Sequence, residues 1–73
     1  MLVGDLVWNS DFDCNCEFEV YDCTEDETCW NDGAECIFSS KRDGWHKPVD
    51  EILDMKIKYV TIHSNVIIIE AGR

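Results

Sequence analysis

Five cysteines lie within the first forty residues of the chain, and two histidines follow later. Thiolates and imidazoles are the ligands that zinc prefers in structural sites, so these residue types predict a metal site. No basic segment precedes the apolar start of the chain, so we expect a cytoplasmic protein, whose thiols stay reduced. An odd number of cysteines also leaves at least one thiol that cannot pair within the chain. We therefore expect bound Zn²⁺ rather than disulfides.

The cysteine spacing selects a ligand set if residues 16–23 and 29–36 form a β-hairpin around a turn at 24–28. That register sets Cys23 opposite Cys29 and Cys16 opposite Cys36, with the two pairs roughly 20 Å apart. One ion cannot hold both pairs, because zinc–sulfur bonds are only about 2.3 Å long. The site is predicted at the open end of the hairpin, with a histidine from the 39–47 loop as fourth ligand: Cys14, Cys16, Cys36 and His46.

A second arrangement stays open, in which the hairpin turn lies at Asn-Asp-Gly, residues 31–33. Cys29 would then face Cys36, which makes Cys29 the alternative ligand. Cys23 is the leading candidate for a non-ligand, since a buried cysteine commonly serves as a small apolar core residue. His63 is expected to be a solvated residue of a hairpin turn.

The same forty residues carry eleven of the sixteen acidic residues and none of the six basic ones. A net charge of −10 argues against nucleic-acid binding, which requires lysine and arginine on the phosphates, and against docking on anionic membranes. It favours a basic protein surface as partner, or simple solubility. If the acidic face is a contact surface, we expect it to include Asp11, Asp13, Glu17, Glu19, Asp22, Glu25, Asp26 and Glu27, with Trp30 as an aromatic anchor.

The residues offer little for catalysis. A Cys36–His46 pair could resemble a thiol-enzyme dyad, but a chain of 73 residues is too small to build a substrate cleft around it. The run Glu25-Asp26-Glu27 lacks the alternating ligands and the fixed glycine of a calcium loop. We therefore expect a protein that is not an enzyme.

The elements that must position these residues form one domain, residues 1–73, whose small core a metal would help to stabilise. We expect an α+β fold: a small antiparallel sheet of two β-hairpins, one or two short helices, and a metal site that staples them. A short helix is predicted at 3–9, strands at 17–23 and 28–38, and a loop at 39–47. A helical turn at 48–54 follows, and then a hairpin of 55–62 and 66–70 around Asn65. The unbroken apolar run from Val66 to Ile69 predicts a central strand or a contact between chains.

The stretch from Glu51 to Glu70, EILDMKIKYVTIHSNVIIIE, is similar to the strand-turn-strand ending of small phage and prophage proteins. Together with the acidity and the cysteines, it resembles the phage-encoded anti-CRISPR proteins directed at type II-A Cas9, in particular a zinc-containing member. The resemblance implies a non-enzymatic inhibitor in the bacterial host cytoplasm that binds Cas9 and blocks the loading of target DNA.

Two other classes of function remain open. One is a zinc-stabilised phage or bacterial protein-interaction module with an unrelated target, either a monomer or a homodimer that associates through residues 66–69. The other is a redox or metal-handling protein. The acidic contact residues named above follow from the charge pattern alone, and the resemblance adds no contact residue to them.

Overall fold

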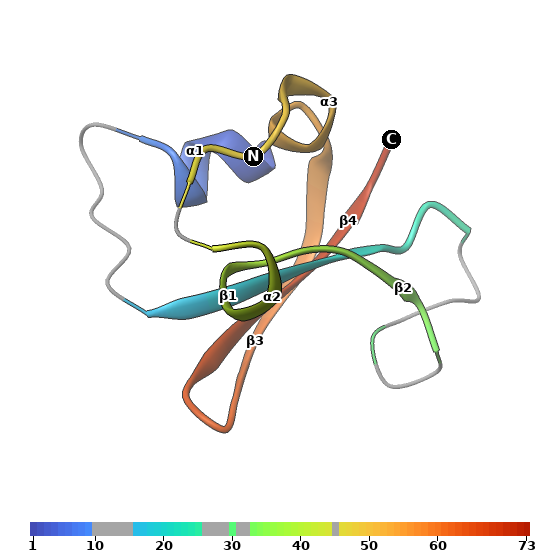
Figure 1. The fold of residues 1–73 in the computed structure, drawn as a ribbon. Coiled ribbons are helices and arrows are strands. Elements are labelled where there is room, and N and C mark those ends of the chain that lie inside the picture. The colour runs from blue at the N-terminus through green and yellow to red at the C-terminus, as the bar shows by residue number, and fades with distance from the viewer. Residues whose placement is uncertain (10–15, 26–29, 31–32, 45) are drawn as a thin grey trace.

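The computed structural model describes residues 1–9, 16–25, 30, 33–44 and 46–73. Within these ranges the elements follow in the order α1, β1, β2, α2, α3, β3, β4 (Figure 1). Their bounds are Val3–Val7 for α1, Glu17–Asp22 for β1, Glu35–Ser39 for β2, Ser40–Asp43 for α2, Asp50–Leu53 for α3, Lys56–His63 for β3 and Val66–Gly72 for β4.

The four strands form one mixed sheet in the order β2-β1-β4-β3. β1 pairs antiparallel with β2, and β3 pairs antiparallel with β4, so both predicted hairpins are present. The two hairpins join through β1 and β4, which run parallel with Glu17 beside Val66 and Asp22 beside Ala71. The α+β class is confirmed, but the prediction of a purely antiparallel sheet is wrong. β4 is the most apolar of the four strands, and β1 runs beside it in the same direction.

β4 is a central strand, as its apolar run predicted. Val66, Ile68, Ile69 and Ala71 are all buried, because β1 and β3 cover both long edges of this strand and side chains cover both faces. The turn before it uses Ser64 and Asn65 at φ of 53° and 65°, as a two-residue turn between twisted strands requires. Residues 66–69 therefore offer no open strand edge to a second chain.

The helices α1 and α3 lie together over one face of the sheet (Figure 1). Val3 and Val7 of α1 and Leu53 of α3 pack there against Val20 and Ile69 of the two inner strands. Gly4 permits the close approach of the helices, because a Cβ at this position would lie 3.2 Å from the Leu53 carbonyl oxygen. The Asp5 carboxylate accepts a hydrogen bond from the Leu2 N–H at 3.0 Å, which satisfies a donor near the start of α1.

Several predicted bounds differ from the structure. The predicted helix 3–9 ends at Val7, and the strands predicted at 17–23, 55–62 and 66–70 are Glu17–Asp22, Lys56–His63 and Val66–Gly72. The predicted loop 39–47 contains α2, whose start is capped by Ser39 Oγ accepting from the Arg42 N–H. The predicted second strand begins only at Glu35, after Gly33 at φ 94°. Residues 28, 29, 31 and 32 of that prediction lie outside the described ranges. The helical turn predicted at 48–54 is present as α3, four residues long.

Candidate functional site

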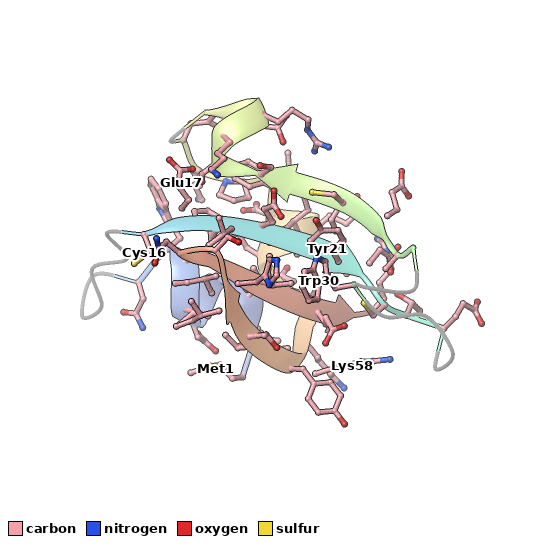
Figure 2. All side chains as sticks on the ribbon, turned by 90° about the horizontal axis from the view of Figure 1, so that it is seen from below. Met1, Cys16, Glu17, Tyr21, Trp30 and Lys58 are labelled. Atoms are coloured by element: carbon pink, nitrogen blue, oxygen red, sulfur yellow. The ribbon has the colours of Figure 1, made fainter. Side chains whose placement is uncertain are left out.

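The register of β1 and β2 separates the predicted zinc ligands. Cys36 lies opposite Tyr21, whereas Cys16 directly precedes β1 and is exposed. Figure 2 shows Cys16 at the start of β1 and Tyr21 toward its far end. Five residues of extended chain correspond to roughly 16 Å, too far for one ion to bind both thiolates. The expected opposition of Cys16 and Cys36 is wrong, and the set Cys14, Cys16, Cys36 and His46 does not fit a single ion in this register.

The cause is the length of the hairpin connection and a bulge. Asp22 and Glu35 form the last pair of the ladder, so the connection runs from 23 to 34, longer than the expected 24–28. A register shift between Val20 and Tyr21 adds one more residue on the β2 side, as a β-bulge does. A spacing argument that assumes a short turn therefore places Cys36 several residues away from its true partner.

The remaining predicted ligands have other surroundings or lie outside the described ranges. His46 is exposed, and its ring meets Phe38 edge-on at 5.5 Å. Cys23, the expected non-ligand, is 2% exposed and donates its backbone N–H to the Ala71 carbonyl at 2.7 Å. In the ranges that the structure describes, no group of three or more His, Cys, Asp or Glu side chains is placed to hold a metal ion. Cys14 and Cys29 lie outside these ranges, so zinc binding itself stays a prediction.

The surroundings of the Cys36 thiol disfavour its thiolate form. Burial raises its pKa, and the nearby Glu19 carboxylate raises it further, while the positive charge of Arg42 partly opposes both. Its Sγ donates to the Phe38 carbonyl oxygen at 3.4 Å, which is not a base. The thiolate is the nucleophilic form of cysteine, so these contacts do not activate Cys36 for thiol chemistry.

The predicted acidic face is present on β1, but its carboxylates are engaged within the fold. The alternation of the strand sets Glu17, Glu19 and Tyr21 on the side away from the buried Phe18 and Val20. Glu19 accepts hydrogen bonds from the Tyr21 hydroxyl at 2.9 Å and from Ser39 Oγ at 3.4 Å.

The first of the β1 carboxylates is also held by the neighbouring helix. Glu17 accepts a hydrogen bond from Ser40 Oγ at the start of α2. Ser40 Oγ in turn accepts the Phe18 N–H at 3.0 Å. Glu17 and Glu19 are half-buried, and with these bonds they are better placed to fix β1 against β2 and α2 than to contact a partner.

The pKa of Tyr21 reflects its burial beside Glu19. Burial, followed by the hydrogen bond and the charge of Glu19, raises the pKa of Tyr21 to about 12. Next to it, Trp30 donates its backbone N–H to Glu70 Oε1 at 2.7 Å and packs its ring against His63 at 4.9 Å. Figure 2 shows Tyr21 and Trp30 close together on this side of the sheet. Trp30, expected to be a partner anchor, is half-buried over β4 and contributes to the fold.

An open cleft of about 380 Å³ lies at the far end of the β1–β2 hairpin. Three carboxyl-bearing residues, Asp22, Glu25 and Glu35, line it together with Thr24, Gly33, Ala34 and Arg73. Glu25 and Glu35 are exposed. Among the described residues, these three carboxylates do not form a group placed to hold a metal ion.

Within the cleft, Asp22 is fixed as a carboxylate. It accepts the Thr24 hydroxyl at 2.6 Å and the Thr24 N–H at 3.1 Å. The hydrogen bond from the Thr24 side chain lowers the pKa of Asp22, the positive charge of Arg73 acts in the same direction, and burial opposes them. The Arg73 guanidinium lies 3.9 Å from Asp22 and also bonds Glu51 on α3. Arg73 therefore places one positive charge beside the carboxylate of Asp22.

The sequence interpretation located this cleft only in part. Asp22 and Glu25 are among the predicted contact residues and line the cleft, whereas Asp11, Asp13, Asp26 and Glu27 lie outside the described ranges. Glu35 was not among the predicted contact residues, and Arg73 was not predicted to belong to a site. Glu70, which accepts the Trp30 N–H, was also not predicted to have a role. The available signal was an acidic residue directly after the apolar run of β4.

No protein-family model, curated protein or solved structure matches this chain. No helix in the described ranges has the length and apolar character needed to cross a membrane.

Proposed function

We propose that the chain is a non-catalytic binding module that engages a basic protein surface through the acidic cleft at the end of the β1–β2 hairpin. The observation that carries this proposal is the set of Asp22, Glu25 and Glu35 around one open cleft, with the Arg73 guanidinium already beside it. A lysine or arginine of a partner would meet a preformed negative site, which favours both association rate and specificity. The net charge of −10 extends that attraction over longer distances.

The first candidate partner is an effector that handles nucleic acid, with Cas9 the leading one. Cas9 holds its guide–target duplex in positively charged channels, and a carboxylate-rich surface competes for the same cations. This choice is supported by the resemblance to anti-CRISPR proteins, which rests on the acidity and the cysteines of the chain together with the strand-turn-strand ending at residues 51–70.

An order-of-addition assay tests this function. The protein is mixed with a Cas9–guide complex either before or after the target DNA, and DNA binding is measured by mobility shift. We expect inhibition only when the protein is added first, because an occupied channel blocks loading but not a complex already formed. Equal inhibition in both orders, or none at any concentration, would refute blocked loading as the mechanism.

We further propose that zinc stabilises the fold, as a chain of only 73 residues with five cysteines suggests. The register implies that such a site draws on cysteines at one end of the β1–β2 hairpin, not on Cys16 and Cys36 together. Elemental analysis of the native protein should find about one zinc per chain, and chelation should lower its melting temperature. A cooperative fold without bound metal would contradict this proposal and indicate that the cysteines only pack in the fold.

A further inference from the structure

β3 forms one edge of the sheet, and most of that edge is open. In the sheet order β2-β1-β4-β3, β3 has β4 on one side only. Among the described residues, the N-terminal segment pairs with its other side just at the beginning, where Leu2 bridges Lys56 and Ile57 donates its N–H to the Met1 carbonyl at 2.9 Å. From Lys58 onward the outer edge is uncovered by any strand of the described chain. Figure 1 shows the β3–β4 hairpin projecting away from α1 and α3.

The hairpin geometry determines which backbone groups face outward. A two-residue turn is closed by a hydrogen-bonded pair, here His63 with Val66. Hydrogen-bonded and non-hydrogen-bonded pairs alternate along an antiparallel ladder. Thr61 is therefore bonded to Ile68, whereas the N–H and C=O groups of Ile62 and Val60 point away from β4. These groups form the row of donors and acceptors that a further strand would use.

The side chains along this edge are apolar and exposed. Ile62 is 73% exposed, Val60 48% and Tyr59 71%. Val60 and Ile62 share the face that carries the helices, because their partners on β4 are Ile69 and Ile67. A pairing strand with apolar residues at alternate positions would cover both side chains at once.

The charge of the strand favours approach by a second copy of this chain. No acidic residue lies between Met55 and Ile69, so this edge is where two chains of net charge −10 repel each other least.

The ammonium group of Lys58 in β3 does not lie along the open edge, where it would discourage strand pairing. Lys58 instead reaches across the end of β4 and donates its ammonium group to the Cys23 carbonyl. Gly72 makes room for this path, since a Cβ there would lie 2.7 Å from the Lys58 Cε. A charged side chain at an edge usually discourages strand pairing, and here that charge is turned away.

The other edge of the sheet is less suited to pairing. β2 spans only five residues and begins with Glu35. Both edge strands contain a bulge, but the bulge of β2 lies in the middle of its short ladder, whereas that of β3 lies between Ile57 and Tyr59, before the residues proposed to pair. Arg42 also donates a guanidinium N–H to the Cys36 carbonyl oxygen at 3.1 Å. Short length, an acidic residue and a bulge are the features that protect edges from pairing.

We propose that β3 pairs antiparallel with β3 of a second copy, with the two-fold axis at Thr61. In this register Val60 of each copy lies opposite Ile62 of the other copy, so apolar side chains meet on the helix-bearing face. Tyr59 lies opposite His63 on the other face. The alternative axis, at Val60, would set Ile62 against Lys58 and leave the apolar side chains less well matched.

The dimer forms one continuous sheet of eight strands with the two β2 strands at its outer edges. Adjacent strands lie about 4.8 Å apart, so the two β2 strands are separated by roughly 34 Å along the sheet. Each end then carries its own acidic cleft, free of the dimer contact. The dimer does not depend on the proposed function, but it would make the module bivalent.

Sedimentation analysis over a range of about 1 µM to 1 mM, which spans the affinities expected of a small interface, measures the dimer directly. We expect the mass to rise from that of the 8.5 kDa chain to twice that value. Ile62→Lys and Val60→Pro should each weaken dimerisation at least tenfold. The proline removes an outward N–H and leaves the bonds to β4 intact.

The control is Val49→Lys, which makes the same apolar-to-lysine change at a residue 63% exposed in the segment before α3. It should leave the dimer unchanged, and circular dichroism verifies the fold of every variant. A monomer throughout the range, equal effects of all three variants, or open-ended growth into filaments would each overturn the proposal.

Oxidative cross-linking tests the register. Tryptic cleavage after Lys58 releases residues 59–73, which contain no native cysteine. In Thr61→Cys this peptide should be recovered disulfide-linked to itself, because residues on the axis form a non-hydrogen-bonded pair about 4.5 Å apart. Tyr59→Cys is the matched control, since its two copies would be roughly 13 Å apart. Equal linkage in both variants, or none at position 61, would refute the proposed axis.

Discussion

Replacing Ile69 by alanine should destabilise the fold far more than the same change at Ile62. Ile69 is fully buried, whereas Ile62 is 73% exposed on the neighbouring strand. The substitution removes about three methylene equivalents, worth about 0.8 kcal/mol each when buried. The cavity left behind raises the loss for Ile69 to about 3–4 kcal/mol. For Ile62 most of the side chain is already in water, so we expect a loss below about 0.5 kcal/mol.

The loss at Ile69 is large for a chain of this size. A domain of this length has a total stability of roughly 4–11 kcal/mol, and each kcal/mol corresponds to about 4–8 °C in melting temperature. Ile69→Ala should therefore lower the melting temperature by about 12 °C or more and Ile62→Ala by less than about 4 °C. The assay is thermal and urea denaturation followed by circular dichroism, at a protein concentration low enough to keep the chain monomeric. Similar losses for the two variants would refute the placement of β4 inside the sheet and β3 at its edge.

Two further predictions concern hydrogen bonds and ionisation around β1. Ser40→Ala should cost about 1–3 kcal/mol in urea unfolding, because it removes the buried hydroxyl that accepts the Phe18 N–H and donates to Glu17; an effect within error would show that these two bonds add nothing to stability. The ultraviolet titration of tyrosine should include a phase at high pH from Tyr21, whose pKa is raised to about 12 by burial and by Glu19. In the unfolded chain Tyr21 ionises at its ordinary pKa of about 10. Below about pH 10 Tyr21 therefore gives stability no pH dependence. Between about pH 10 and 12 only the unfolded chain loses this proton, so the free energy of unfolding falls as the pH rises. Glu19→Gln should move the Tyr21 phase to lower pH, and an unchanged Tyr21 phase would exclude Glu19 as a cause.

Several features of the fold could be predicted from short-range sequence patterns. The alternation of Glu17, Phe18, Glu19 and Val20 fixes a half-buried strand, because adjacent side chains point to opposite faces. The apolar run from Val66 to Ile69 indicates a strand covered on both faces, and β4 is central. These patterns succeed because each depends only on neighbours within a few residues.

The arrangement of the two hairpins could not be predicted in the same way. Nothing in the local sequence states that β1 joins β4 in parallel, since that pairing depends on which strands bury the most apolar surface together. The cysteine register failed for a related reason: a bulge after Val20 and a long connection moved Cys36 opposite Tyr21. The helix α2 was missed because four residues carry too little periodicity, although Ser39 is a typical N-cap residue.

The acidic character of the site could be predicted, but not its individual residues. The charge pattern of the sequence located the carboxylates on and around β1. In the structure, some of them form hydrogen bonds within the fold and others line the cleft. Glu17 and Glu19 hold Ser40, Tyr21 and Ser39 within the fold. The exposed Glu35 is left available to line the cleft beside Asp22. Such a division depends on hydrogen-bond partners distant in sequence, which composition does not reveal.

The most direct test of the account is the affinity of the protein for a Cas9–guide complex, compared between Glu35→Lys and Asp54→Lys by biolayer interferometry at fixed salt. Both residues are exposed acids and both variants make the same charge change, but only Glu35 lines the cleft. We predict that Glu35→Lys weakens binding at least tenfold, about 1.4 kcal/mol, while Asp54→Lys changes it less than about threefold. Equal weakening by both variants would show that binding depends on net charge alone and not on the cleft. Absence of binding by the unaltered protein would contradict Cas9 as the partner.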